Sequence, residues 1–593
     1  MTNKVCYWLI CFTPIGEDHV PRIFGFAEFI ASLALLVIVY TVVDVRYRFR
    51  IAIAPLPLYQ LTFLFIGIIG AESLLSEIWL AQQWWVPEFF TIPSVVWQGI
   101  FGTLFLMTFM TWIWYAFMRP PVFGRRNAAR YSRELYHLIV KGSDSELPVI
   151  AAELRRSARS IVNCSRSVPP RFLGNEQQSP VRAPRKARAD DYAHDLLLLI
   201  GNRKLCRHIV ASAPMTALAF FDEAAKAKKF QLPLGQFAKN ISGEAIANRD
   251  SNLYHETDGF SSGLLGYIKP FSQTVYGNYW LMEGLGERFG APLDVDYRER
   301  QAWKADQWRA YCAATAITFS SFLKETGGDR HSFVLFRAIG EIEGSFGDMY
   351  KLNDLDGDYY DTDIYRRFSV AVEFVTTTVT IIEKLNQPPR GSKLRRRELD
   401  PQKDIYDLLA SLMFEILFAA SGFEGPPEKA WMIHHNSAWH YFFGLGAQSK
   451  TWRILQFKLR RLLYDEVKQM DSFVNFKGAR VLGFCLNVMG LNITSGNFGR
   501  AYRPLARAIH EWTRRNYLRL RAANLDVAAV VLTGSITYDA PKNRLVKTYL
   551  RGLSLEAPKE YLTLDGDGVS LNLQPPRMAR RAPRHRPKQK RPD

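Results

Sequence analysis

Cysteine is scarce in this chain of 593 residues, and none of its six cysteines forms a CxxC pair. Cys6 and Cys11 stand near the amino terminus, and the other four are dispersed between positions 164 and 485. Structural zinc sites and small stapled domains depend on closely spaced cysteines. The spacing therefore predicts neither a zinc site nor a disulfide framework.

Motifs for catalysis are also missing. The sequence contains no Walker loop for nucleotide phosphates and no HExxH motif for zinc. A G-x-S-x-G pattern surrounds Ser261, but polar residues precede it where a nucleophile elbow needs a buried strand, and Gly266 and Pro270 interrupt the helix that should follow. The sequence therefore does not favour an enzyme.

Long apolar runs are confined to the first 118 residues. They cover residues 23–43, 53–70 and 94–118, and the third contains no charged residue. A helix needs about 20 apolar residues to cross ~30 Å of hydrocarbon. The second run is shorter and contains Pro55 and Pro57, which a first helical turn tolerates. The runs predict a membrane domain with three transmembrane helices, after an extracytoplasmic segment of residues 1–22.

Basic residues flank these runs on one side only. Arginines fill the turn between the first two runs and follow the third, at Arg46, Arg48, Arg50, Arg119, Arg125 and Arg126. The connection from residue 71 to residue 92 carries three glutamates and no Lys or Arg. Lys and Arg near the ends of spans are retained in the cytoplasm. This bias predicts a multi-pass protein of the plasma (inner) membrane, with the amino terminus outside and residues 119–593 in the cytoplasm.

Tryptophans lie near both expected membrane interfaces. They are Trp79, Trp84 and Trp85 in the outer connection, and Trp112 and Trp114 at the inner end of the third run. Indole rings favour the headgroup level, so we expect these five to mark the interfaces with the lipid bilayer. The third run also carries the small residues Gly99, Gly102 and Thr103, which suit close helix contact and leave a homo-oligomer open.

The rest of the chain has the character of a water-soluble, helical protein. The whole sequence is 48% hydrophobic and 22% charged, with a mean hydropathy of −0.11. Apolar residues recur at three- and four-residue spacing over most of it. Strand patterns are confined to Val527–Leu532, Leu545–Leu550 and Val569–Leu573. The expected fold is mainly α: three transmembrane helices, a large helical cytoplasmic region, and a minor α/β or β portion near the carboxyl terminus.

Basic stretches that contain proline divide the cytoplasmic part. They predict a juxtamembrane stalk at 119–164, a linker at 165–189, a helical domain at 190–386, a linker at 387–404, a C-terminal helical domain with some strand at 405–574, and a disordered tail at 575–593. Near a membrane, each basic residue gains about 1 kcal/mol from anionic lipid. We therefore expect the linkers and the tail to contact anionic lipid, ahead of nucleic acid.

One acidic run interrupts this basic sequence. Five aspartates occur in ten residues, at Asp354, Asp356, Asp358, Asp361 and Asp363. Hard cations prefer such oxygens, so the run is a candidate site for a divalent cation, Ca²⁺ or Mg²⁺. The EF-hand register is not met, because placing Gly357 at the turn puts Leu352 at the first ligand position. The alternatives are an exposed turn or a surface that docks an arginine linker.

These patterns together predict a membrane protein that presents a large cytoplasmic binding, scaffold or sensing module. The alternative is an oligomeric pore or membrane effector that the cytoplasmic part gates. Apolar runs without charged lining or a filter sequence argue against a permanent channel. A membrane-tethered enzyme is the third alternative.

Overall fold

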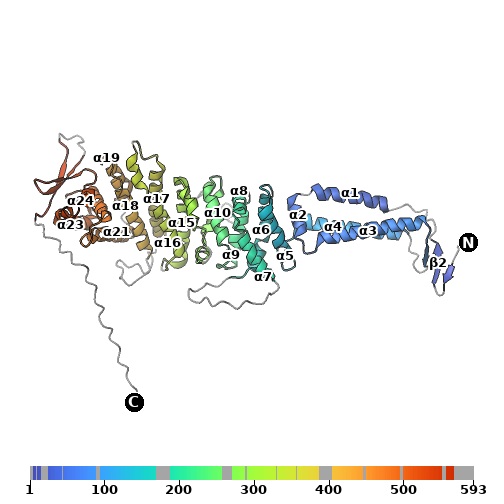
Figure 1. Cartoon of the computed structure of the whole chain (residues 1–593). Coiled ribbons are helices and arrows are strands. Elements are labelled where there is room, and N and C mark those ends of the chain that lie inside the picture. Colours follow the sequence, from blue (N-terminus) through green and yellow to red (C-terminus); the bar gives the residue numbers. More distant parts are fainter. Residues whose placement is uncertain are drawn as a thin grey trace, which may run out of the picture. The chain divides into compact units, whose positions relative to one another are not determined.

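A computed structural model describes most of the chain in two compact units (Figure 1). The described residues are 5–7, 10–14, 24–42, 44–87, 94–167, 187–256, 270–287, 290–328, 330–355, 357–385, 404–444, 449–493, 499–549 and 556–566. The first unit comprises Met1–Trp303, Ala313–Ser321 and Ser332–Ala338, and the second comprises Lys304–Cys312, Phe322–His331 and Ile339–Asp593. Much of the two expected linkers and the whole of the Ser261 motif lie outside the described residues.

Three apolar helices run side by side at the start of the first unit (Figure 1). They are α1 (Phe26–Val42), α3 (Leu58–Ala81) and α4 (Ser94–Ile113), and the π-helix η2 (Trp114–Met118) extends α4. The short helix α2 (Val45–Ala52) connects α1 to α3. Their shared core is a cluster of Phe29, Ile66, Ile69 and Phe101. We call this set of helices the apolar bundle.

The prediction of three transmembrane helices is not supported by helix length. Among the described residues, two helices are long and apolar enough to cross a membrane, Leu58–Ala81 and Val95–Met118. Helix α1 has 17 residues, which at 1.5 Å per residue reach only about 26 Å. Helix α3 begins five residues later than expected, because residues 45–52 form a helix of their own. It continues to Ala81, so much of the expected outer connection is helical.

A small sheet adjoins the end of the apolar bundle opposite α2. Its antiparallel strands are β1 (Val5–Tyr7), β2 (Ile10–Pro14) and β3 (Trp85–Pro87), in that order. The hairpin places Cys6 opposite Cys11, and Cys11 is disulfide-bonded. The expectation of no disulfide is therefore wrong for this segment, because strand pairing brings two cysteines together that show no motif spacing.

The remaining helices of the first unit are amphipathic and pack their apolar faces together. They are α5 (Ala128–Lys141), α6 (Glu146–Cys164), α7 (Ala189–Leu199), α8 (Arg203–Ser212), α9 (Pro214–Lys226), α10 (Gly235–Ala247), α11 (Asn252–His255), α12 (Phe271–Tyr276), α13 (Tyr279–Gly286) and α14 (Tyr297–Gln301). Helix α6 is central, since it packs against α7, α8 and α9 as well as α2. It is therefore the element through which the apolar bundle meets the helices that follow.

The second unit is helical with a small antiparallel sheet. Its helices include α17 (Asp363–Lys384), α18 (Ile405–Ser421), α19 (Pro427–Trp431), η5 (Met432–Trp439), α20 (His440–Phe443), α21 (Lys450–Gln469), α22 (Phe476–Met489), α23 (Arg503–Ala523) and α24 (Leu525–Val530), with the 3₁₀ turn η4 (Met349–Asp354). Helices α15 (Ala305–Thr326) and α16 (Phe333–Gly344) contribute to both units. The strands are β4 (Ile536–Asp539), β5 (Arg544–Thr548) and β6 (Lys559–Thr563).

This sheet confirms the expected minor β portion near the carboxyl terminus, although one strand prediction is wrong. Residues 527–530 are helical rather than extended, because the side chain of Asn524 accepts hydrogen bonds from Asp526 N at 3.0 Å and Val527 N at 3.1 Å. Such an N-cap starts a helix even in a β-branched sequence. The expected strand at 569–573 and the basic tail from residue 575 lie outside the described residues.

Candidate functional site

The arginine-rich helix α2 forms the base of the apolar bundle. Asp44 caps it, since its side chain accepts a hydrogen bond from Arg46 N at 3.4 Å. Residues four apart share a helix face, so Arg46 and Arg50 point the same way and Arg48 points elsewhere. Arg50 is only 6% exposed. A buried cation requires a partner with a matching charge.

That partner is Glu153 on α6. Arg50 donates from Nε to Oε2 of Glu153 at 2.9 Å and from Nη2 to Oε1 at 2.6 Å. Its Nη1 donates to the carbonyl oxygen of Ala116 in η2 at 2.8 Å. Glu153 is also buried, and Nε of Arg46 lies 3.5 Å from its Oε1. One guanidinium therefore joins α2, η2 and α6 through directional, charge-assisted bonds.

The turn from α2 to α3 is also fastened to α5. Nδ2 of Asn127 donates to the carbonyl oxygen of Ile53 at 2.7 Å, and Nη2 of Arg130 donates to that of Pro55 at 2.6 Å. Tyr131 is fully buried beside them, and this burial raises the pKa of its hydroxyl. We call the contacts of α2 with η2, α5 and α6 the α2 junction. It connects the apolar bundle to the rest of the first unit without a flexible linker.

The opposite end of the apolar bundle carries acids. Glu28 accepts a hydrogen bond from Gly25 N at 2.9 Å, and Glu77 of α3 accepts one from Phe26 N at 3.0 Å. Carboxylates at a helix N-terminus satisfy free N–H groups and interact favourably with the helix dipole. The bundle is therefore polarised, with arginines at the α2 junction and glutamates at the end that adjoins the β1–β3 sheet.

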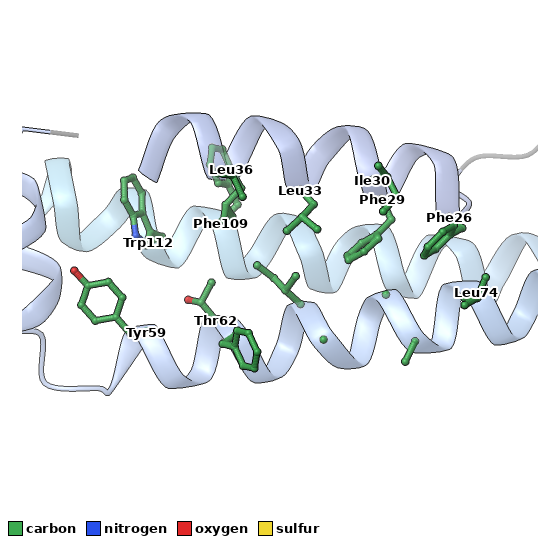
Figure 2. Close-up of a pocket in the computed structure, with 16 residues that line it drawn as sticks. Phe26, Phe29, Ile30, Leu33, Leu36, Tyr59, Thr62, Leu74, Phe109 and Trp112 are labelled. Atoms are coloured by element: carbon green, nitrogen blue, oxygen red, sulfur yellow. The ribbon is translucent and has the colours of Figure 1, made fainter. Parts of the chain in front are cut away.

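An apolar groove of about 750 Å³ runs between α1, α3 and α4. Figure 2 shows its lining side chains, from Phe26 and Leu74 at one end to Tyr59 and Trp112 at the other. Among the lining residues, Tyr59, Thr62 and Trp112 are the ones with a polar side-chain atom. The groove can hold a hydrocarbon chain, but it offers nothing that would guide an ion through it.

The predicted interfacial residues occupy both surface and core. Trp84 and Trp85 are exposed, and so is Trp114. The Trp79 ring, in the last turn of α3, meets the Trp84 ring edge-on at 5.3 Å between centroids. Trp112 is instead buried in a cluster with Ile51, Ala54, Leu58 and Ala116 at the base of the bundle. Arg48, Arg119, Arg125 and Arg126 are exposed, unlike Arg50.

The candidate cation site does not converge in the part of the run that the structure describes, which excludes Asp356. Asp361 pairs with Arg366 at 3.0 Å, and Asp363 pairs with Arg367 at 3.0 Å. Asp358 accepts a hydrogen bond from Tyr360 N at 3.0 Å. No group of three His, Cys, Asp or Glu side chains among the described residues could hold a metal ion. The cation site therefore stays a prediction that rests on the sequence.

A buried polar chain lies inside the second unit. Lys547 of β5 donates to the carbonyl oxygen of Asn487, and its ammonium lies 4.6 Å from the ring centroid of Trp431 and 4.5 Å from that of Tyr549. Burial lowers the pKa of Lys547 to about 8. Because Asn487 lies in the last turn of α22, the lysine compensates the negative end of that helix.

Asn487 extends this chain to His434 in the π-helix η5. Its Nδ2 lies 3.1 Å from Nδ1 of His434, whose Nε2 lies 3.1 Å from the carbonyl oxygen of Phe423. This arrangement fits a neutral imidazole that donates from Nε2 and accepts at Nδ1. Complete burial lowers the pKa of His434 to about 4. All these partners are internal, so the chain acts on the stability of the second unit.

Sequence reasoning did not find Glu153 or Lys547. A signal for Glu153 exists: it lies three residues after Ile150 and one before Leu154, on the buried face of α6. An acid inside an apolar stripe needs a buried partner. No protein-family model matches the chain, and neither a curated protein nor a solved structure is similar to it. The candidate site therefore has to be understood from its own geometry, which centres on the α2 junction.

Proposed function

We propose that the chain is an integral membrane protein whose apolar bundle crosses the bilayer. Its helical remainder lies in the cytoplasm as a binding or sensing module, and the α2 junction couples the two. The observation that carries this proposal is the exposure of apolar side chains on α3 and α4. Only 22% and 17% of the most apolar windows of these helices are buried.

The exposed side chains are large. Phe63 is 84% exposed, and Met107 and Met118 are 64% and 70% exposed. Helices in the core of a soluble protein bury such residues, and contiguous exposed apolar surface marks an interaction with lipid or with another protein. Helix α3 alone, with 24 residues, reaches about 36 Å, which is enough to cross the ~30 Å hydrocarbon layer.

The topology supports three crossings, although α1 is short. Strand β2, which precedes α1, pairs with β3, which connects α3 to α4. Helix α2, which follows α1, contacts η2 at the far end of α4. The chain between β2 and α2 therefore travels the whole length of the bundle. If α3 and α4 cross the membrane, the segment that contains α1 crosses as well.

Charge and cysteine chemistry support the orientation. The arginines of α2 and Arg119 lie at one end of the bundle, where the positive-inside rule places the cytoplasm. The disulfide-bonded Cys11 belongs to the sheet at the other end. Cys164, Cys206 and Cys312 in the remainder are free. Disulfides persist outside the cytoplasm and thiols stay reduced within it.

Cysteine labelling of the full chain in intact cells tests this proposal. In a Cys164→Ser background, Gln82→Cys probes the outer end of α3 and Ala129→Cys probes α5, and both positions are exposed. A membrane-impermeant maleimide should label Gln82→Cys in intact cells and Ala129→Cys only after permeabilisation. Labelling of Ala129→Cys in intact cells would overturn the orientation. Release of the chain from membranes by alkaline carbonate would overturn the membrane location.

A further inference from the structure

A second, polar pocket lies beside the α2 junction. Its volume is about 300 Å³, and its charged or titratable lining residues are Arg48, Glu134, His137, Lys141 and Glu146. Tyr59 lines this pocket and also the apolar groove. The two cavities therefore meet at one phenol ring, with hydrocarbon side chains on one side of it and charges on the other.

We propose that the two cavities together bind one phospholipid molecule. An acyl chain occupies the apolar groove, and a phosphoethanolamine headgroup occupies the polar pocket. This inference rests on the proposed membrane location, because the bilayer supplies the ligand. It goes further by assigning a specific lipid site to the junction that couples the bundle to the cytoplasmic module.

The shape of the groove suits an acyl chain. Its volume of about 750 Å³ lies within the ~300–1,000 Å³ range of ligand pockets. A Cβ atom added to Gly67 would meet no atom within 4 Å, so the groove is open at the middle of α3. Tyr59 stands at the end of the groove (Figure 2), where a ring with one polar edge suits the level of the headgroups.

The charges of the pocket suit a zwitterionic headgroup. The side chain of Arg48 is 55% exposed, and its Nη2 lies 3.8 Å from Oε1 of Glu146, longer than a direct charge-assisted bond. A phosphate can approach this guanidinium and the ammonium of Lys141, as both groups are common phosphate partners.

The acids of the pocket complete the match. Glu146 Oε2 already accepts a hydrogen bond from Ser143 N at 2.9 Å. Glu134 lies seven residues before Lys141, on the same face of α5, and forms no ion pair with the residues that the structure describes. Its carboxylate can accept the primary ammonium of the headgroup. Two cations and two carboxylates fit a phosphoethanolamine better than a headgroup with a net negative charge.

Native mass spectrometry of the full chain tests the proposal. The protein is released from nanodiscs that contain equal amounts of phosphatidylethanolamine and phosphatidylglycerol, and the retained lipid is counted. We expect one phosphatidylethanolamine per chain. Gly67→Leu fills the groove, and Gly99→Leu is its matched control, because Gly99 also has no neighbour within 4 Å but does not line the groove.

Gly67→Leu should lower retention about tenfold or more, the equivalent of displacing roughly two methylene groups, while Gly99→Leu retains the lipid. Lys141→Ala should lower retention, with Arg126→Ala as the control outside the pocket. Equal retention in Gly67→Leu and Gly99→Leu would overturn the site, and preferred retention of phosphatidylglycerol would overturn the headgroup assignment. Failure of the membrane location itself would appear separately, as release of the chain by carbonate.

Discussion

Replacement of Glu153 by glutamine provides the sharpest test of the α2 junction. The amide keeps the shape of the side chain but removes its charge, and its NH₂ group meets a guanidinium that can only donate. Arg50 then keeps the carbonyl oxygen of Ala116 at 2.8 Å as its remaining strong acceptor. Leaving one partner of a buried ion pair uncompensated costs about 3–5 kcal/mol. We expect this loss from the free energy of unfolding of α2 and α6.

The structure also predicts an asymmetry between the two partners. In Arg50→Met, Glu153 keeps Arg46, whose Nε lies 3.5 Å away and whose side chain is 40% exposed. A half-exposed pair offsets up to about 1 kcal/mol, so Arg50→Met should cost less than Glu153→Gln. The double replacement Arg50→Met with Glu153→Leu removes both charges and should be close to neutral.

Amide hydrogen exchange of the full chain in nanodiscs measures these effects locally, because it reports the opening of single helices. Arg48→Ala is the matched control, since the pair of Arg48 with Glu146 is exposed and 3.8 Å long. It should cost less than about 1 kcal/mol. The reasoning is refuted if Glu153→Gln protects α6 as well as Arg48→Ala does, or if the costs of the two single replacements simply add in the double variant.

Three further predictions concern burial. Because burial lowers the pKa of Lys547 from 10.5 to about 8, the unfolded state binds more protons between these values, and the second unit should gain ~3 kcal/mol as pH rises through them; urea unfolding at pH 7.5 and 10 should lose this difference in Lys547→Met, and an unchanged difference would contradict it. Burial lowers the pKa of His434 from 6.5 to about 4, so stability should fall as pH drops through that window, and His434→Gln should unfold with a weaker dependence on acid. A Cβ at Gly70 would lie 2.6 Å from the ring of Phe29, so Gly70→Val should lower the thermal stability of the bundle by about 1–3 kcal/mol, whereas Gly67→Ala should leave it unchanged.

Local patterns predicted what depends on local patterns. Apolar periodicity indicated a mainly helical chain, and β-branched residues around Val546 indicated a strand that the structure contains as β5. The bounds of α3 could not be read in the same way. An apolar run does not reveal that residues 45–52 form a separate helix, or that Glu77 is tolerated because Phe26 N donates to it.

The candidate site was harder to predict, because its parts are distant in sequence. Arg50 and Glu153 are 103 positions apart, and Lys547 is 60 positions from Asn487. The arginines of α2 were recognised as a signal of orientation, which treats them alike. Only the folded chain distinguishes Arg50, which is buried and paired, from Arg48, which faces solvent.

The π-helix η2 makes the region after α4 sensitive to chain length. Its wide turn, closed by the hydrogen bond from Arg119 N to the carbonyl oxygen of Trp114 at 2.8 Å, accommodates one more residue than an α-helical turn would. Deleting a single residue between 114 and 118 would restore a regular helix and rotate everything downstream by about 100°. Hydropathy would barely change, yet Asn127, Arg130 and Glu153 would face away from α2. Length variation should therefore be selected against at these five positions and tolerated on the far side of α5.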